Sequence, residues 1–417
     1  MENKSFRADF SDPYQNATVG PFWIGDLDHA YQLGFKQATL ALLAAAAAEF
    51  YVDPNTDETV HVYVDALVYP ICFNARHFVE LFLKDSIRGV SALGANATQV
   101  GIIDHHELTE LWTSFAAAIK RDNRLVELGM PLEEVFKDIA KVDNTSMTFR
   151  YSHDLRENVH LSGIEHINLG VLGDRLRKMF KQAEEFSFCL TVLQQEYAQG
   201  TFTRKLHRAN IEAIARRLPP HVKWAEELEP VKKEVCVQHG LSSNDFCKAL
   251  VLIKRHREFT SLIGLELPLA ELPVDVFTRF ARVHAGDATY DVITRDEWLG
   301  MDAVMEISRP DSYSEEYDRY LKRISSPDYE GPFDPAHIVR NAYARNQRLR
   351  GGLVKLGQRT LLAALVEAIP HLAEPMKTPP RRTAEEISAD AEEMLTHSMA
   401  FAHPNLEAIK GTELGED

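Results

Sequence analysis

The sequence predicts an all-α protein, in which an N-terminal helical bundle with a small β-hairpin is followed by a second multi-helix domain. Apolar residues recur at helical spacing along most of the chain, for example at Leu108, Leu111, Trp112 and Phe115. Connectors that contain Pro or Gly separate these stretches. A chain of 417 residues is too long for one ordinary hydrophobic core. Because 45% of its residues are hydrophobic, it has enough apolar material for two.

The N-terminal part contains several helical stretches and one extended pair. Pro70 either kinks the second helix or starts it afresh, and Asp104 stands where the N-cap of the third would be. The segments 147–151 and 158–161 are the only extended pieces and predict the hairpin. The helices are expected over residues 28–51, 60–90, 105–121, 131–142 and 164–197.

Gly200 marks the expected domain boundary, which gives an N-terminal bundle over 1–200, an all-helical domain over 201–375 and an acidic helical or frayed tail over 376–417. Ser242 or Ser243 fits an N-cap in the second domain. The helices that flank this cap fit either an ordinary αα-hairpin, the commoner case, or a DNA-binding helix-turn-helix. The helices of this part are expected over 203–217, 221–239, 243–263, 273–284, 294–305, 313–324, 334–349, 352–370 and 383–398.

The net charge of −16 argues against binding of nucleic acid by the surface as a whole, because phosphate is repelled overall. A local basic groove is still compatible with it. One stretch between Asp334 and Glu367 has basic residues and no acidic ones, and is the candidate nucleic-acid-binding segment; the alternative is a solvated helix face balanced by acids elsewhere. Its residues are Arg340, Arg345, Arg348, Arg350, Lys355 and Arg359.

Membrane and secretion signals are missing from the sequence. The longest apolar run, Ala38–Ala48, is about half of what a bilayer span needs, and the first residues have no apolar signal core.

The four cysteines are scattered and form no Cys-x-x-Cys pair, so we expect free, buried thiols in a reducing cytoplasm. Adjacent His105 and His106 point about 100° apart on a helix, so we expect no metal site there, and no phosphate loop indicates a cofactor.

The candidate site lies in the second helix. Arg76, Glu80 and Lys84 are spaced by four and line one helix face, with His77 beside them and His106 at the start of the next helix as the partner from outside. Because the rest of this helix is apolar, the polar stripe is buried or lines a cleft. Two interpretations compete: a buried network that fixes how two helices dock, or a site that handles a phosphate and transfers protons.

The order of three motifs resembles the HEPN superfamily over residues 28–198. The motifs are Phe73-x-x-Arg76-His77-x-x-Glu80-Leu81-x-Leu83-Lys84, then His106-x-Leu108-x-x-Leu111-Trp112, then Phe149-Arg150-Tyr151. The resemblance implies a bundle of four or five helices that forms a homodimer. It also implies a metal-independent endoribonuclease in prokaryotic antiviral defence or a toxin–antitoxin system, with RNA as substrate and an antitoxin or defence protein as partner.

Active HEPN ribonucleases have an Arg and a His separated by four to six residues, and this region has no such pair. Arg156 and His160 are one residue too close. Either this branch uses other residues, or the bundle is a non-catalytic module that dimerises and binds a protein or nucleic acid. In the first case Arg76 would hold the phosphate, His106 would transfer protons and Glu80 would orient one of them. The complete catalytic set is Arg76, His77, Glu80, Lys84 and His106, with Arg150, His153, Arg156 and His160 as secondary candidates.

Overall fold

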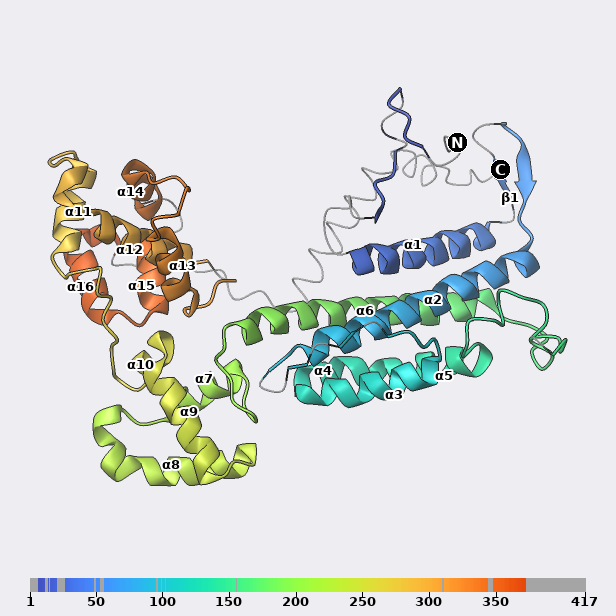
Figure 1. Cartoon of the computed structure of the whole chain (residues 1–417), viewed down its shortest axis with the longest axis horizontal. Helices are drawn as coiled ribbons and strands as arrows, with labels where there is room; N and C mark the ends of the chain where they lie inside the picture. Colours follow the sequence, from blue (N-terminus) through green and yellow to red (C-terminus); the bar gives the residue numbers. More distant parts are fainter. Residues whose placement is uncertain are drawn as a thin grey trace, which may run out of the picture. The chain divides into compact units, whose positions relative to one another are not determined.

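The structure of the chain is a computed structural model that is mostly helical, which confirms the predicted all-α class (Figure 1). It describes residues 7–11, 14, 16–20, 27–48, 50–52, 56–94, 97–98, 100–101, 103–154, 156–309, 311–343 and 348–372. The chain divides into two units, Met1–Gln195 and Glu196–Asp417, so the division lies within a few residues of Gly200. The helix expected over 383–398 and the tail over 376–417 lie outside the described residues.

The N-terminal unit is built from long helices that lie along one another (Figure 1). Phe82 of α2 marks the centre of its core, because its ring contacts Phe115 of α3, Phe136 of α5 and Phe186 of α6. Helix α1 packs along α2, and its Lys36 donates to Glu184 of α6. The helices are α1 (Leu27–Ala47), α2 (Val64–Ser91), α3 (Leu108–Ala118), α4 (Asn123–Gly129), α5 (Glu133–Val142) and α6 (Leu169–Ala198), with short 3-10 turns at Ile119–Arg121 and Met130–Leu132.

The hairpin is present, but not where it was expected. Strands β1 (Phe50–Val52) and β2 (Thr59–His61) pair antiparallel across the turn that was expected merely to separate two helices. The segments 147–151 and 158–161 form turns, held by an isolated bridge between His153 and Val159. The β-branched and aromatic residues of these two strands are the missed signal.

The start of α3 differs from the expectation for a clear reason. The helix begins at Leu108, and its N-cap residue Glu107 makes no side-chain cap. Instead Asn144, from the loop after α5, accepts the Leu108 amide with its carbonyl at 3.1 Å and the Thr109 amide with its side-chain oxygen at 3.0 Å. A residue distant in sequence therefore caps this helix, and Asp104 does not. Pro70 lies inside α2, which continues through it.

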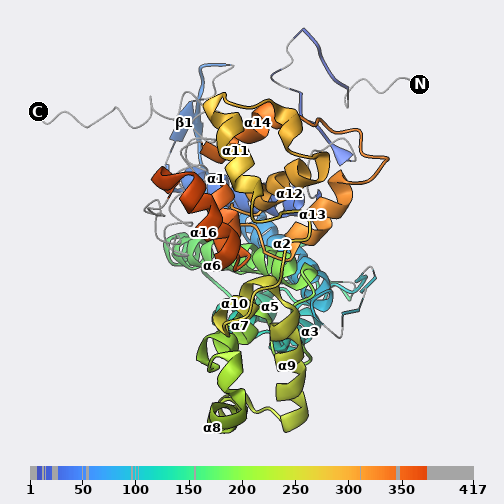
Figure 2. The same ribbon diagram turned by 90° about the vertical axis from the view of Figure 1, so that its left-hand side faces the viewer.

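The second unit has two hydrophobic cores. Phe246 and Phe259 are fully buried in the first, and Trp298, Tyr317 and Phe280 belong to the second. Figure 2 shows the corresponding groups of helices, α7 to α10 and α11 to α16. Their bounds are α7 (Arg208–Arg217), α8 (Trp224–His239), α9 (Ser243–Arg255), α10 (Arg257–Leu262), α11 (Val276–Ala285), α12 (Arg295–Glu306), α13 (Glu316–Ile324), α14 (Pro335–Tyr343), α15 (Arg348–Lys355) and α16 (Arg359–Ala368).

Ser242 caps α9 in a capping box with Asp245, as expected. Two predicted helices are divided in the structure. The span 243–263 breaks at His256, whose extended backbone ends α9 and whose ring Nδ1 accepts the Phe259 amide to cap α10. The span 352–370 breaks between α15 and α16 at Gly357, which has φ of +66° and lies against Ser261, so a side chain there would be strained and would clash.

Candidate functional site

The Glu80 carboxylate is the centre of a polar network between α2 and the start of α3. Its Oε2 accepts from the Arg76 guanidinium. Its Oε1 accepts from Lys84 Nζ at 2.9 Å and lies 2.6 Å from His106 Nδ1. The spacing of four residues places Arg76, Glu80 and Lys84 on one face of α2, and the loop before α3 supplies His106. The structure therefore joins four of the five predicted catalytic residues by close contacts, and the Nδ1 of the fifth, His77, lies 3.9 Å from Glu80 Oε2.

Arg76 is fully buried, with 0% of its surface exposed. Its Nη2 donates to the carbonyl oxygens of His106 and Asn144, and its Nε donates to the carbonyl of Asp143 at 3.4 Å. The guanidinium thus joins α2 to the loops on both sides of α3 and has no surface left for a phosphate. This geometry argues against the phosphate-binding role assigned to Arg76 and favours the network that fixes how helices dock.

The same network sets the charge of Glu80. Burial alone would raise the pKa of this carboxyl, but hydrogen bonds from Lys84, His106 and Arg76 outweigh burial and lower its pKa to about 2. Glu80 is therefore an anion at neutral pH and stabilises the cations around it. Its role here is to pair and orient, and not to take up a proton.

His106 and Lys84 form the part of the network that solvent reaches. The His106 side chain is 63% exposed and the Lys84 side chain 14% exposed. The contact between Glu80 and Nδ1 leaves the other ring nitrogen of His106 free to meet a ligand. Lys84 Nζ lies 3.5 Å from His106 Nδ1. An imidazole held by a buried carboxylate is the arrangement that orients a general acid or base.

His77 lies apart from this exposed pair. Its ring is packed between Phe35, with ring centroids 4.4 Å apart, and Phe73, with centroids 5.8 Å apart. Burial lowers its pKa, and the positive charge of Arg76 adds to that effect while Glu80 opposes it. His77 is thus a neutral, aromatic-packed ring, and a proton-transfer role has less support than at His106.

The secondary candidates lie in the loop between α5 and α6. His153 and Arg156 are exposed, and Asp154 orders the loop by accepting from the backbone amides of Arg156 and Asn158. His160 Nε2 is buried without a hydrogen-bond partner among the described residues. None of these residues makes a contact with the Glu80 network that the described part of the chain records.

An aromatic groove of about 360 Å³ lies where this loop meets α2. It is lined by Tyr69, Pro70, Phe73, Phe149, Arg150 and Tyr151. The Arg150 guanidinium is 5.2 Å from the centre of the Tyr151 ring and 5.9 Å from that of Phe73. Arg150 is exposed and forms no ion pair with an acid in the described residues. Its Nη2 donates to the Tyr151 hydroxyl at 3.3 Å. Aromatic rings beside an exposed guanidinium suit a planar, anionic ligand. Tyr69 was not predicted; its spacing of four from Phe73, on the exposed side of the helix, is the signal that was available.

The basic stretch 340–359 does not form one binding surface. Lys355 Nζ donates to the backbone carbonyls of Arg309 and Ser312, at 2.6 and 2.7 Å, which ties α15 to the loop after α12. Arg340 contacts Asp334 at 3.4 Å. Arg350 has its Nε buried, Arg348 is half-buried and Arg359 is exposed, while Arg345 lies outside the described residues. The cations are divided among three helices, so the nucleic-acid role expected of this stretch loses its geometric basis.

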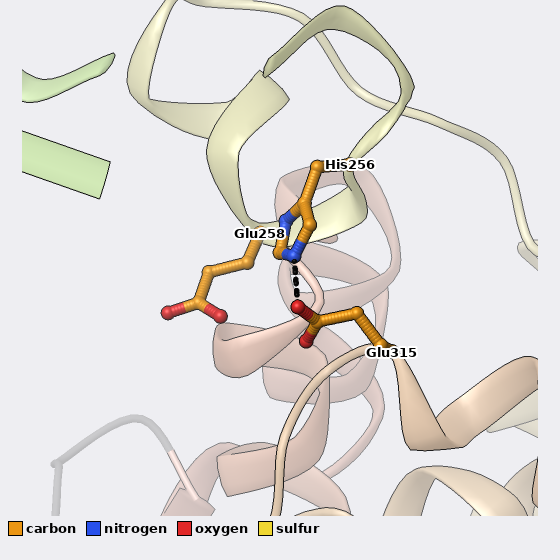
Figure 3. Close-up of side chains that lie close together, drawn as sticks. All are labelled: His256, Glu258 and Glu315. Atoms are coloured by element: carbon orange, nitrogen blue, oxygen red, sulfur yellow. Dashed lines mark ion pairs between the residues drawn. The ribbon is translucent and has the colours of Figure 1, made fainter. Parts of the chain in front are cut away.

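A cluster of ionisable side chains in the second unit joins its two cores (Figure 3). His256, Glu258 and Glu315 have ligand atoms within 4.8 Å of one another, close enough to hold a metal ion. However, Arg208 already bridges the carboxylates: its Nη2 lies 2.5 Å from Glu258 and its Nε 2.9 Å from Glu315. Its guanidinium also stacks over Phe259, 5.0 Å from the ring centre. One guanidinium of the protein therefore already pairs with both carboxylates.

The tautomer of His256 supports an ion-pair network over a metal site. Its Nδ1 accepts the Phe259 amide at 3.2 Å, so the ring proton is on Nε2, which lies 2.8 Å from Glu315 Oε1. Binding a metal through Nε2 would require that proton to move to Nδ1 and the cap of α10 to be lost. Burial would raise the pKa of Glu315, but the contacts with His256 and Arg208 outweigh it and hold the pKa well below its usual range.

Comparisons with known protein families, with curated proteins and with solved structures find no match to this chain. Among the described residues, no helix combines the length and the apolar character required to cross a bilayer.

All four cysteines are free, but only Cys72 is buried and Cys247 is exposed, so the expectation of uniformly buried thiols is wrong.

Proposed function

We propose that the N-terminal unit binds single-stranded RNA and stacks a base in the aromatic groove. The observation that carries the proposal is the exposed guanidinium of Arg150, which has aromatic rings and no acid among its described neighbours. Base stacking on an aromatic side chain contributes about 1–3 kcal/mol per base. Arg150 would meet the phosphate of the stacked nucleotide while Phe73 or Tyr151 meets the base.

The acidic balance of the chain limits this interaction to a local site. With a net charge of −16, the surface as a whole repels a polyanion, so affinity must come from stacking and from few phosphate contacts. For single strands, each phosphate neutralised contributes about −0.7 to the slope of log affinity against log salt. The proposal therefore implies weak salt dependence, with a slope near that of a single contact.

Cleavage of the bound RNA is the second candidate function, and a specific observation favours it. His106 is exposed and held at Nδ1 by the buried Glu80 carboxylate, with Lys84 beside it. Attack of a ribose 2′-OH on phosphorus needs a base, an acid and a cation near the phosphorane oxygens. His106 would transfer the proton and Lys84, not Arg76, would supply the charge. The resemblance to HEPN proteins adds that such an activity would serve antiviral defence or a toxin–antitoxin system in the cytoplasm, in a homodimer.

The test uses fluorescence anisotropy of a labelled 12-nucleotide RNA with the full chain in EDTA, and the same DNA sequence for comparison. We expect Tyr151→Leu to weaken RNA binding by about 5- to 150-fold, the range of one lost stacking contact, and Arg150→Gln to weaken it as well. Arg177→Gln is the matched control, because it removes the same charge from the exposed surface of α6, outside the groove. RNA affinity equal in the groove variants and the control would refute the proposal.

The same samples, run on denaturing gels, separate binding from cleavage. If the unit is a nuclease, His106→Gln stops cleavage and leaves binding within twofold of the wild type. RNA that stays intact with every variant, while binding still depends on Tyr151, identifies a non-catalytic RNA-binding module.

A further inference from the structure

A second hollow, the α13 hollow, lies in the second unit and has a volume of about 440 Å³. It is lined by Arg319, Lys322, Arg323, Ser326, Asp328 and Tyr329. The three cations are exposed and fall on one face of α13, while Tyr317, Leu321 and Ile324 fill the buried face. Residues that were not singled out in the sequence therefore form a concave basic surface.

The three cations are distinguished by lying together around one hollow. Arg319 donates to the side-chain oxygen of Gln199, and the Arg323 guanidinium lies over the Tyr320 ring at 4.9 Å. Neither these two nor Lys322 forms an ion pair with an acid in the described part of the chain. Elsewhere in this unit, Arg208, Arg257, Arg279 and Arg309 each contact a carboxylate. In a chain with 62 acidic and 46 basic residues, three adjacent cations that form no ion pair with an acid among the described residues offer a site for an anion.

The helix end offers a plain alternative, because cations in a last turn are stabilised by the helix dipole. That effect accounts for Lys322 and Arg323, but not for the concave shape or for the other walls. Tyr329 forms one wall and lies directly over Gly331, where a Cβ atom would come within 2.2 Å of the ring. Asp328, at the rim, can accept hydrogen bonds from hydroxyl or amino groups.

We propose that the α13 hollow binds a nucleoside phosphate. The phosphate groups would meet Arg319, Lys322 and Arg323, the planar base would pack against Tyr329, and the Asp328 carboxylate would accept from a ribose hydroxyl or a base amino group. A bare phosphate would use the cations alone and would be repelled by Asp328, so the mixed lining favours a ligand with both kinds of group. This site is independent of the aromatic groove, which belongs to the other unit.

Isothermal titration calorimetry of the full chain with ADP in EDTA tests the proposal, with inorganic phosphate and ribose 5-phosphate as comparison ligands. We expect saturable ADP binding that is at least about tenfold tighter than phosphate binding, and a loss of about tenfold or more with Arg319→Gln or Arg323→Gln, as for a lost charge-assisted hydrogen bond. Arg282→Gln is the matched control, since Arg282 is exposed on α11 and lies outside the hollow.

Gly331→Ala provides a variant without a charge change. The added methyl group must displace the Tyr329 ring, so we expect weaker ADP binding and unchanged phosphate binding. Several outcomes would overturn the proposal: no saturable ADP binding, equal affinity for ADP and phosphate, or equal losses in Arg319→Gln and Arg282→Gln. Circular dichroism of each variant shows that the fold is intact.

Discussion

Replacing Arg76 by methionine tests whether the network on α2 is architectural. The substitution keeps much of the side-chain volume and removes the guanidinium, which donates to Glu80 and to the carbonyls of Asp143, His106 and Asn144. Each buried acceptor that loses its donor costs about 1–3 kcal/mol, and removal of one partner from a buried ion pair costs about 3–5 kcal/mol in all. Lys84 still pairs with Glu80 and His106 Nδ1 still contacts it, so we expect a loss of about 3–5 kcal/mol in the free energy of unfolding of the N-terminal unit.

Hydrogen exchange measured by mass spectrometry is the suitable assay, because it reports the two units separately. Peptides from α2 and α3 should lose protection by that amount in Arg76→Met, while peptides from α9 and α12 stay unchanged. For a unit of this size, the loss corresponds to a decrease of about 6–20 °C in Tm. Arg175→Met is the matched control, since Arg175 forms only exposed pairs with Glu134 and Asp138 and should change stability by less than about 1 kcal/mol.

The result that would refute this reasoning is an Arg76→Met protein with wild-type protection in α2 and α3. If such a protein also lost RNA binding or cleavage, the guanidinium would be a functional group and the buried arrangement would not represent the working state. Loss of protection equal to that of Arg175→Met would likewise remove the case for an architectural network.

Two further predictions concern pH and thiol chemistry. The pKa of Glu80 is lowered from 4.5 to about 2. Its contribution to stability, about 3 kcal/mol, is therefore present above about pH 4.5 and is lost as the pH falls toward 2. Acid unfolding of α2, followed by hydrogen exchange, should show this loss, and the Glu80→Gln variant should lack this pH dependence. Burial, with a smaller effect of Asp143, raises the pKa of Cys72 to about 12. Iodoacetamide should therefore label the exposed Cys247 first and Cys72 only in denaturant. Equal labelling rates for the two cysteines would contradict the buried placement of Cys72.

The sequence was sufficient to predict the class of fold and the helical face of the network. Local periodicity places Arg76, Glu80 and Lys84 on one side of a helix, and an apolar surround indicates burial. The sequence could not decide between a cleft and an interior, because that depends on the loops that cover the face. Asn144, which caps α3 and accepts from Arg76, is 68 residues away from the arginine in sequence.

The ion-pair network of the second unit was missed for the same reason. Arg208 and Glu315 are 107 residues apart, and no local pattern links them. The division at His256 was also hidden, because the ring of that residue caps α10 from a position that helical periodicity treats as continuous. Helix limits set by long-range caps are thus less predictable than helix faces set by spacing.

The basic residues show why density along the sequence misleads about binding surfaces. The stretch from Arg340 to Arg359 is rich in cations, yet Lys355 is bonded to backbone carbonyls and Arg340 is paired with Asp334. Arg319 and Arg323 stand in a stretch that also contains Glu316 and Asp318, so local composition hides them. Asp318, however, is bonded to Arg257, and Glu316 accepts from Gln199, so neither acid of this stretch forms an ion pair with the α13 cations. In an acidic protein, unpaired cations that gather around one hollow indicate where an anion can bind, and only the folded chain shows which cations gather in this way.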